Sequence, residues 1–316
     1  MTSKANMASR LLRGFGGTLG THKTARPGSD FLPTAISKQL DERRTMKEER
    51  PAAAVTLAVA VNNQAVLEAN LLASPALHEN PGQRAKRELL IQEGYSSAAE
   101  AYNQAIERSP YDLIVFLHQD IYLPSGWFER LQFCIAQLEK QDPAWGVAGC
   151  WGATRDGVGF GHVYSPGVGV LGERFDQPQP VQTLDEIVLV MKRSRGLRFD
   201  PGLDHFHFYG ADLCLEAKAR GLRSYAISAF CVHNGNYQLV LPPEFYQAYG
   251  YFKGKWRAEL PVQTPCIRVS RFDRDLRERR VREWFRRLRG RMIGQFRAEN
   301  PALLYEQLRS QWPATQ

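Results

Sequence analysis

The chain has 316 residues, a hydrophobic fraction of 43% and a net charge of +8 at pH 7. These values allow a large folded core, and no apolar run approaches the ~20 residues that a membrane-spanning helix needs. The basic charge lies at the ends: the first 50 residues hold ten Lys or Arg against five acids, and residues 268–297 hold twelve Arg against four acids. A nucleic-acid-binding protein usually carries its basic patch on the folded module, so we expect no nucleic-acid partner.

Five cysteines lie far apart in the sequence, without a Cys-x-x-Cys pair. This spacing favours small buried thiols and predicts neither a disulfide framework nor a zinc site. The first 20 residues contain arginines and glycines in place of a continuous apolar stretch, so they do not resemble a secretory signal. Together these features predict a cytoplasmic protein.

Residues 1–50 lack sustained periodicity and are expected to be mostly disordered, with room for a short helix at 35–46. We expect one folded domain over 51–260, followed by an Arg-rich helical extension over 261–316. Buried strands are predicted at 55–61 and 113–117, and further strands at 145–150, 187–191 and 224–232, with room for a short strand at 89–92. Helices are predicted at 64–72, after Ser97, from Trp127, around Asp212 and at 242–256. This alternation predicts an α/β fold with a doubly wound sheet.

The strand at 113–117 runs directly into His118-Gln119-Asp120. In extended backbone, residues two apart point to the same side, so His118 and Asp120 are expected to project together. Open α/β sheets bind ligands at the carboxyl ends of their strands, which makes this pair a candidate site. The alternative is that both side chains only cap a loop.

Three further features allow more than one interpretation. The glycine-rich segment 152–172 is expected to form mobile loops that can lie over a ligand, but no Walker-type lysine follows it. Asp212, in the first turn of a helix, is typical of an acid that suits the helix dipole. His205 and His207 would share one face of a strand and could bind metal, or they line a cleft and pack beside Tyr209.

Several of these stretches occur in an order that resembles a known family. The motifs are Asn62-Asn63 after the first strand, Ser97 to Asn103, Phe116-Leu-His-Gln-Asp120 with Gly126-Trp127, Thr183-Leu-Asp-Glu186, Phe199-Asp200, Phe208-Tyr-Gly-Ala-Asp-Leu-Cys-Leu-Glu-Ala217 and Cys231-Val-His-Asn234. Over roughly residues 55–260 the chain is similar to the bacterial glycosyltransferase-like proteins of the family 2 type. The resemblance implies that 51–260 is a GT-A domain, a doubly wound mixed sheet sandwiched by helices.

The resemblance also implies an activity. This is an inverting, hexosyltransferase-type transfer of a sugar from a nucleotide-sugar donor to an acceptor hydroxyl, in the synthesis of surface polysaccharide or glycoconjugate. The implied acceptor is a glycan or a lipid-linked acceptor. A divalent ion, Mn²⁺ or Mg²⁺, would stabilise the charge that develops on the leaving diphosphate.

By the same resemblance, each candidate residue has an implied role. Donor contacts fall on Asn62, Asn63, Asn103, His118 and Gln119. Metal ligation falls on Asp120 and His233, and the role of catalytic base falls on Asp212. Contacts with the acceptor fall on Asp185, Glu186, His207 and Tyr209.

Two positions depart from the family pattern. The first Asp of the metal-binding Asp-x-Asp is His118, and the Glu of the catalytic Glu-Asp pair is Ala211. The histidine leaves three alternatives open: a preference for Mn²⁺, which tolerates imidazole better than Mg²⁺ does; a metal held mainly by Asp120 and His233; or a reaction without metal.

The arginine-rich segment carries five apolar residues at helical spacing: Val281, Trp284, Phe285, Leu288 and Met292. An arginine-rich helix with such a stripe is typical of an interfacial anchor, which predicts peripheral contact of residues 276–293 with the inner face of a membrane. The alternative is a helix that docks its stripe on the catalytic domain or on a second subunit.

Three other functions fit parts of the sequence. A sugar-nucleotide pyrophosphorylase shares the fold, but it would carry a glycine-rich loop with Arg and Lys where Asn62-Asn63-Gln64 stands. A non-catalytic nucleotide- or carbohydrate-binding protein is favoured by the missing first Asp and disfavoured by the retained Asp212. A nucleic-acid binder is the third alternative, and its affinity would fall steeply with salt.

Overall fold

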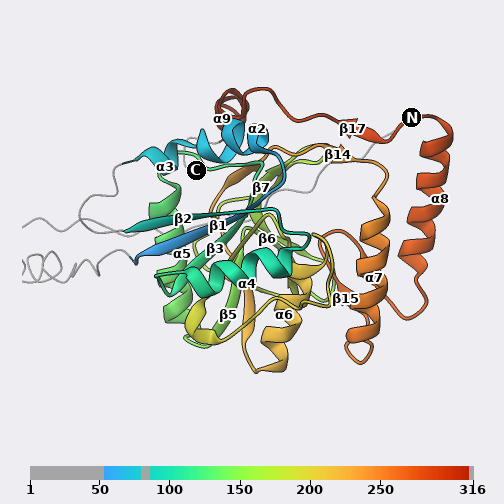
Figure 1. The fold of residues 1–316 in the computed structure, drawn as a ribbon, viewed down its shortest axis with the longest axis horizontal. Helices are drawn as coiled ribbons and strands as arrows, with labels where there is room; N and C mark the ends of the chain where they lie inside the picture. Colours follow the sequence, from blue (N-terminus) through green and yellow to red (C-terminus); the bar gives the residue numbers. More distant parts are fainter. Residues whose placement is uncertain (1–52, 80–85, 313–316) are drawn as a thin grey trace, which may run out of the picture. The chain divides into compact units, whose positions relative to one another are not determined.

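The computed structural model describes residues 53–79 and 86–312, and these form one compact unit. A central sheet runs through this unit with helices on both of its faces (Figure 1). The helix expected at 35–46 lies outside the described residues. The alternation of strands and helices predicted from the sequence is therefore confirmed for the part of the chain that carries the candidate residues.

The central sheet has seven strands in the order β2-β1-β3-β11-β5-β12-β9. Their bounds are β1 Val55–Val61, β2 Arg87–Glu93, β3 Leu113–His118, β5 Trp145–Gly149, β9 Gln179–Val181, β11 Val188–Lys192 and β12 Arg223–Ala226. Strand β1 runs parallel to β2 and β3, whereas β11 is antiparallel to both of its neighbours. The sheet is thus mixed, as the resemblance implied.

Helices cover both faces of this sheet, and β3 shows why. Its residues Leu113, Val115 and Leu117 pack on the side of α5 (Trp127–Gln141). The alternate residues Ile114 and Phe116 pack on the opposite side. That side is covered by α4 (Ala98–Arg108) and α6 (Tyr209–Ala219). Because successive side chains of a strand point to opposite faces, an unbroken apolar run is buried on both of them.

The helix predicted at 64–72 is present as α2 (Gln64–Leu67) followed by a π-helical turn (Glu68–Leu72), and α3 (Pro75–His78) comes next. At the start of α4 the Ser97 hydroxyl accepts the Glu100 N–H at 3.2 Å, as an N-cap should. The Glu100 carboxylate returns to Ser96 rather than to Ser97. Ser97 therefore caps the helix that was predicted to follow it, and the Glu100 carboxylate binds the residue before the cap.

A second sheet was not predicted. Its six strands are β4 Ile121–Tyr122, β6 Trp151–Ala153, β7 Gly159–Ser165, β8 Gly169–Gly172, β10 Thr183–Leu184 and β13 Cys231–His233. Residues 152–172 therefore form strands and their turns, not mobile loops. At Gly161, φ is +148° and a Cβ would come within 2.0 Å of the Cys150 carbonyl oxygen, so glycine permits close packing of two strands here. The strand predicted at 224–232 is in fact β12 and β13, in different sheets.

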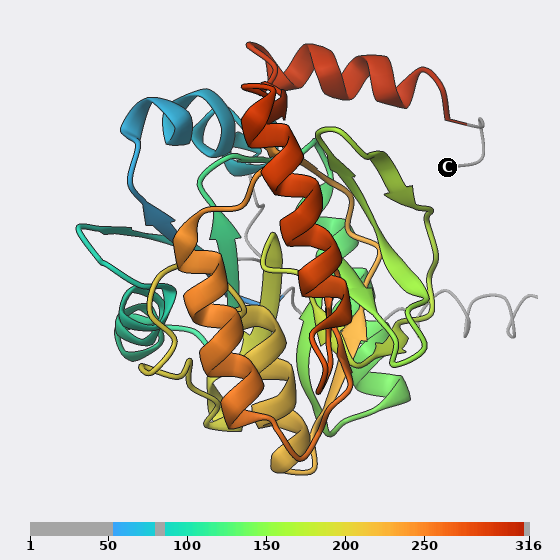
Figure 2. The same ribbon diagram turned by 90° about the vertical axis from the view of Figure 1, so that its right-hand side faces the viewer.

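The C-terminal region contains three helices and short strand pairs. The bounds are β14 Tyr237–Gln238, α7 Pro243–Lys255, β15 Val262–Gln263, β16 Arg268–Val269, α8 Arg274–Leu288, β17 Ile293–Gln295 and α9 Pro301–Arg309. Earlier in the chain, a 3₁₀ turn at Arg193–Arg195 follows β11. Helices α7 and α8 lie side by side (Figures 1 and 2). No helix within 53–79 and 86–312 combines the length and apolar composition needed to cross a membrane. Four of the five cysteines are buried and all five are free, as predicted.

The Asp142 carboxylate, just after α5, binds two residues of β12 and so helps to hold this strand beside β5. It accepts two bonds of 2.7 Å from Arg223 and one of 2.9 Å from the Tyr225 hydroxyl, and Arg223 lowers its pKa to about 2. We expect Asp142→Asn to lower the free energy of unfolding by about 1–2 kcal/mol at pH 7, because charge-assisted hydrogen bonds are lost. The loss is no larger because Arg223 is largely exposed and solvent screens the ion pair. Urea unfolding measures this.

The contribution of Asp142 to stability depends on pH in a defined direction. The folded pKa of Asp142 is depressed, so its contribution is present above the ordinary value of 3.8 and is lost as the pH falls toward about 2. The difference between wild type and Asp142→Asn should shrink over that interval. Asp176→Asn, at an exposed aspartate that also pairs with an arginine, is the matched control and should change stability little. Equal losses in both variants would contradict the prediction.

Candidate active site

Two strand ends meet at the candidate site. Strand β3 ends at His118, and after a two-residue turn the chain continues as β4. Strand β4 pairs antiparallel with β13, which sets His233 opposite Ile121. The N–H of Asn234 then donates to the Asp120 carbonyl oxygen at 2.8 Å. This pairing places His233 beside Asp120 although they are far apart in the sequence.

His118, Asp120 and His233 form a compact group of metal-ligating side chains. One ligand atom from each lies within 4.8 Å of the other two, and all three residues are half-buried. The Asp120 Oδ1 atom is 3.5 Å from His233 Nε2 and 4.0 Å from His118 Nδ1. In the part of the chain that the structure describes, this is the one group of its kind. His118 and Asp120 therefore do project together, as the sequence predicted.

The surroundings of this group fit a bound cation. The Asp120 Oδ1 atom is buried and has no hydrogen-bond partner among the described residues, which is costly for a carboxylate unless something binds it. Gly235 keeps space beside two donor atoms, because a Cβ there would lie 2.9 Å from Asp120 Oδ2 and 3.0 Å from His233 Nε2. One carboxylate with two imidazoles suits Mn²⁺ better than Mg²⁺.

Tyr209, in the first turn of α6, holds the ring of His118. Its hydroxyl lies 2.9 Å from His118 Nε2 and donates to the Glu186 carbonyl oxygen at 3.3 Å. This contact orients the imidazole ring, so that Nδ1 faces Asp120. Burial lowers the pKa of His118, and the nearby His233 lowers it further. A neutral imidazole is the form that ligates metals.

An amide cluster lies next to this group. Gln119 Oε1 accepts the N–H groups of Asn62 and Asn63 at 3.1 and 3.0 Å, and Gln119 Nε2 donates to Asn62 Oδ1 at 2.6 Å. Asn63 also caps α2, because its Oδ1 accepts the Val66 N–H at 3.1 Å. Three of the five predicted donor contacts, Asn62, Asn63 and Gln119, thus lie together where β1 and β3 end, and both asparagines are exposed.

Asp185 and Glu186 lie in the turn between β10 and β11, against the N-terminus of α6. The Gly210 N–H donates to Glu186 Oε1 at 3.4 Å, and Glu186 is linked through Tyr209 to His118. Burial raises the pKa of Glu186 to about 8, and the charge of Asp185 adds to this. Glu186 is therefore a carboxylate whose proton is exchangeable near neutral pH.

Asp212 has a different setting. It is 1% exposed, and its carboxylate binds Lys255 Nζ at 2.8 Å and accepts the Trp256 indole N–H at 2.6 Å. Lys255 also pairs with Asp200 at 2.6 Å and with Glu216 at 2.9 Å. Burial nevertheless raises the pKa of Asp212 to about 6. These contacts tie α6 to α7, and the role of Asp212 as a base stays a prediction.

Two other predicted site residues also have structural contacts. The Asn103 amide exchanges two hydrogen bonds with the backbone of Phe199, at 2.8 and 3.0 Å, and its contact with the donor stays a prediction. Residues 205–208 form bends rather than the strand that was considered, and they contribute no ligand to the group of three. The His207 ring packs edge-on against Phe245 with centroids 5.5 Å apart, and burial lowers its pKa to about 4.

A large cavity lies away from this group. It has a volume of about 880 Å³ between α5, β7 and α9, and it contains none of His118, Asp120 or His233. Its walls include the aromatic residues Phe230, Tyr305 and Trp312. Volume alone therefore does not locate the chemistry of this protein, whereas the arrangement of ligand atoms does.

Comparison with known proteins gives the family. The model of the Glycosyltransferase like family matches residues 56–240. The chain belongs to this family. With the mixed sheet between its helices, membership confirms the GT-A type fold predicted from the sequence.

Other proteins are similar to this glycosyltransferase-like chain. A stretch of 143 residues is 32% identical to the ATP synthase subunits region ORF 6 protein of Fuscovulum blasticum and covers 42% of this chain and 56% of that protein, so the match spans little more than half of its length. The solved mannosyltransferase PcManGT from Pyrobaculum calidifontis, in complex with GDP-Man and Mn²⁺, is 15% identical over 73% of both chains, with a TM-score of 0.41. TarS of S. aureus is 13% identical over 64% of this chain and 39% of its own, with a TM-score of 0.39.

The sequence did not reveal three residues that shape the site of this glycosyltransferase-like protein. Gly235 leaves room for a ligand, and the Ser165 hydroxyl lies 3.5 Å from His233 Nδ1, so that Nε2 faces Asp120. Asn234 is 2% exposed and its side chain bonds to Asn70 and to the backbone of Ala298. The only sequence signal was the position of Asn234 and Gly235 directly after His233 at a strand end.

Lys255 allows a test of the structural role of Asp212. We expect Lys255→Met to lower the free energy of unfolding by about 3 kcal/mol or more, because three carboxylates, one of them fully buried, lose their cation. Lys253→Met is the matched control: it lies two residues away on α7 with similar exposure and pairs with Asp273. That variant should lose less than about 1 kcal/mol. Equal losses in chemical denaturation would contradict the structural role given to Lys255.

Proposed function

We propose that this protein is an inverting glycosyltransferase of the hexosyltransferase type. It transfers a sugar from a nucleotide-sugar donor to an acceptor hydroxyl. The observation that carries the proposal is the His118, Asp120 and His233 group at the end of β3, beside the amides of Asn62 and Gln119, in a chain of this family. The solved mannosyltransferase with a similar chain contains GDP-Man and Mn²⁺, which is in keeping with this donor class.

In this proposal His118, Asp120 and His233 hold a divalent cation, with Mn²⁺ favoured. When bound, such a cation supplies positive charge to the donor diphosphate. Tyr209 orients His118 for this task, and Ser165 lies beside the other nitrogen of His233. The exposed amides of Asn62 and Asn63 are proposed to contact the nucleotide, with Gln119 holding the turn that presents them.

The base must accept the proton of the acceptor hydroxyl. Glu186 is the candidate that we favour. Its backbone carbonyl accepts the Tyr209 hydroxyl that also contacts His118, which places the residue near the metal-ligating group, and the pKa of its carboxyl is raised to about 8. Asp212, the base predicted from the sequence, is the second candidate, although Lys255 and Trp256 occupy its carboxylate. Asp185 and His207 are proposed to contact the acceptor.

We place this reaction in surface polysaccharide or glycoconjugate synthesis, in the cytoplasm, with a glycan or lipid-linked acceptor. A non-catalytic nucleotide- or carbohydrate-binding protein is the second candidate function. It is favoured by one observation: the carboxylate predicted to be the base is neutralised by Lys255. Such a protein would bind donor without releasing the nucleotide product.

The metal and donor site can be tested by ligand binding. We expect Mn²⁺ with one of the UDP-, GDP-, CMP- or dTDP-sugars to raise the melting temperature. At a hundredfold excess of ligand over Kd, binding adds about 2.7 kcal/mol to the free energy of unfolding. Asp120→Asn should weaken Mn²⁺ affinity at least about 100-fold in calorimetry, since it removes the carboxylate ligand. Asp156→Asn, in an exposed turn, is the control and should bind normally.

Each outcome decides between the two functions. Metal-dependent binding with release of nucleoside diphosphate and an inverted anomeric centre by NMR supports the transferase. Binding without release supports the non-catalytic protein. Undiminished turnover in EDTA contradicts the metal site, and the absence of binding by any nucleotide-sugar contradicts the transferase and the nucleotide-binding protein.

The pH profile identifies the base. A base acts when deprotonated, so with Glu186 the rate should rise with pH to an inflection near 8, set by the raised pKa. Glu186→Gln should lower kcat by about 10²–10⁴-fold and leave folding intact. An inflection near 6, with kcat preserved in Glu186→Gln, would assign the base to Asp212 instead.

A further inference from the structure

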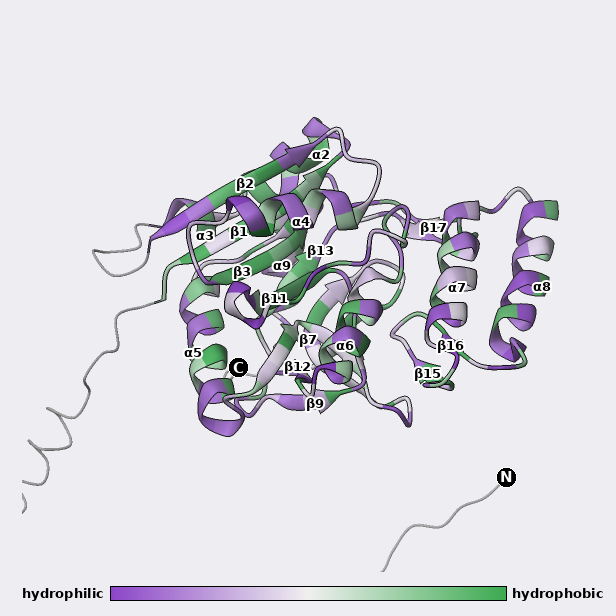
Figure 3. Cartoon of the chain, turned by 60° about the horizontal axis from the view of Figure 1, so that its bottom comes forward, coloured by the Kyte–Doolittle hydropathy of each residue, from purple (hydrophilic) through white to green (hydrophobic). Residues whose placement is uncertain are grey.

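Helix α8 presents an apolar face to the outside. Four large apolar side chains recur along it, each between 49% and 65% exposed: Val281, Trp284, Phe285 and Leu288. Spacings of three and four residues place them on one side of the helix. The flanking segments add three more exposed side chains: Phe272, Met292 and Phe296. Figure 3 shows α8 at the edge of the folded unit, beyond α7.

The opposite side of α8 is fixed to the protein. Leu276 packs in the apolar cluster around α7. Glu283 is 3% exposed and accepts hydrogen bonds from the Tyr246 hydroxyl, from the Leu241 N–H at 3.3 Å and from Arg279 at 3.0 Å. Rotation of the helix about its axis would bury the apolar face, but the Glu283 carboxylate would lose these hydrogen-bond partners. The alternative that the helix docks this face on the catalytic domain is therefore wrong.

The apolar face is surrounded by positive charge. Residues 268–297 hold twelve arginines and four acids, a net charge of +8. Glu278 and Glu283 already pair with arginines of the same helix, and Asp273 pairs with Lys253. Eight exposed arginines of this segment have no carboxylate partner among residues 53–79 and 86–312: Arg268, Arg271, Arg277, Arg280, Arg282, Arg287, Arg289 and Arg291. Whatever covers this face must accept apolar side chains and neutralise several guanidinium groups.

These requirements select the occupant. A second copy of the chain would bring the same arginines against each other, because a two-fold interface uses the same patch on both subunits. An anionic lipid leaflet meets both requirements, since its phosphates pair with arginine while its acyl boundary takes Trp, Phe and Leu. We propose that α8, with residues 272 and 288–296, is a docking surface for an anionic membrane. The helix lies along the leaflet with Val281, Trp284, Phe285 and Leu288 immersed.

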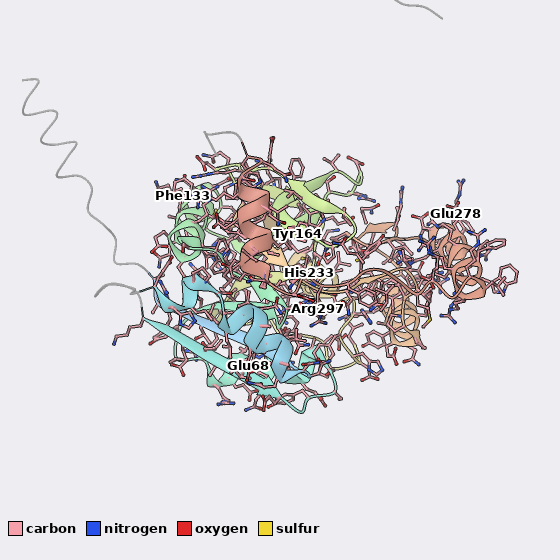
Figure 4. The ribbon with its side chains drawn as sticks, turned by 90° about the horizontal axis from the view of Figure 1, so that it is seen from above. Glu68, Phe133, Tyr164, His233, Glu278 and Arg297 are labelled. Carbon is pink, nitrogen blue, oxygen red and sulfur yellow. The ribbon has the colours of Figure 1, made fainter. Side chains whose placement is uncertain are left out.

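This surface is separate from the candidate active site. Glu278, on α8, lies at the outer edge of the unit and away from His233 (Figure 4). Residues that bind lipid are thus not the residues proposed to bind donor or metal. Membrane docking does not rest on the proposed reaction, and each can fail without the other.

Vesicle flotation of the full chain tests the proposal. We expect the protein to float with vesicles of phosphatidylcholine and phosphatidylglycerol but not with phosphatidylcholine alone, and to be released as salt screens the arginines. Trp284→Ser/Phe285→Ser/Leu288→Ser should weaken vesicle binding at least about tenfold, because three immersed side chains are lost. The matched control is Val158→Ser/Val168→Ser/Val170→Ser, which removes three exposed apolar side chains of the β6–β8 region and should bind like wild type.

A charge variant keeps the proposal testable if the serine variant does not fold. Arg282→Glu/Arg289→Glu changes two exposed side chains and should also weaken binding about tenfold or more, while circular dichroism and Mn²⁺ binding remain as in wild type. Wild type that ignores anionic vesicles, or both test variants floating like wild type, overturns the proposal. A concentration-dependent dimer that disappears in the serine variant, without vesicle binding, assigns the face to a second copy instead.

Discussion

The candidate site depends on the pairing of β4 with β13. Without it, His118 and Asp120 would be two polar residues at the end of a buried strand. The pairing adds His233 to them, and Asn234 secures it by bonding Asp120 through its backbone and Asn70 through its side chain. Since Asn234 is buried, breaking these bonds would leave polar groups without partners, which is costly. A short ladder of two strands thus has the stability to hold three ligand atoms within 4.8 Å.

The sequence predicted the local structure well because its signals are local. Apolar runs marked β1, β3 and β11, and Ser97 marked the start of α4. The second sheet could not be predicted in this way, because its glycines are needed for contacts between distant segments. Gly161 approaches Cys150, and Gly172 approaches Gly161 in turn. Composition shows such glycines as loop signals, and only the tertiary contacts reveal them as close packing of strands.

Tertiary contacts that the sequence does not show also distinguish the candidate residues from one another. Asp120 and Asp212 were both polar residues beside apolar segments, with comparable signals in the sequence. In the structure Asp120 has an oxygen without a partner, whereas Asp212 is held by Lys255 and Trp256. Those two partners lie about forty residues further on, and no spacing rule connects them to Asp212. Whether a carboxylate is available for chemistry is thus decided by distant residues that the sequence order does not pair.

The same distinction applies to α8. Its apolar stripe and its arginines were visible in the sequence, but its orientation was not. That orientation follows from Glu283, a buried carboxylate whose partners come from α7, from the segment before it and from its own helix. A buried charge with fixed partners does not allow the helix to rotate, so the opposite face stays outside however apolar it is. The exposure of Trp284 and Phe285 is therefore a property of the fold and requires a partner from outside residues 53–79 and 86–312, or a permanent contact with water.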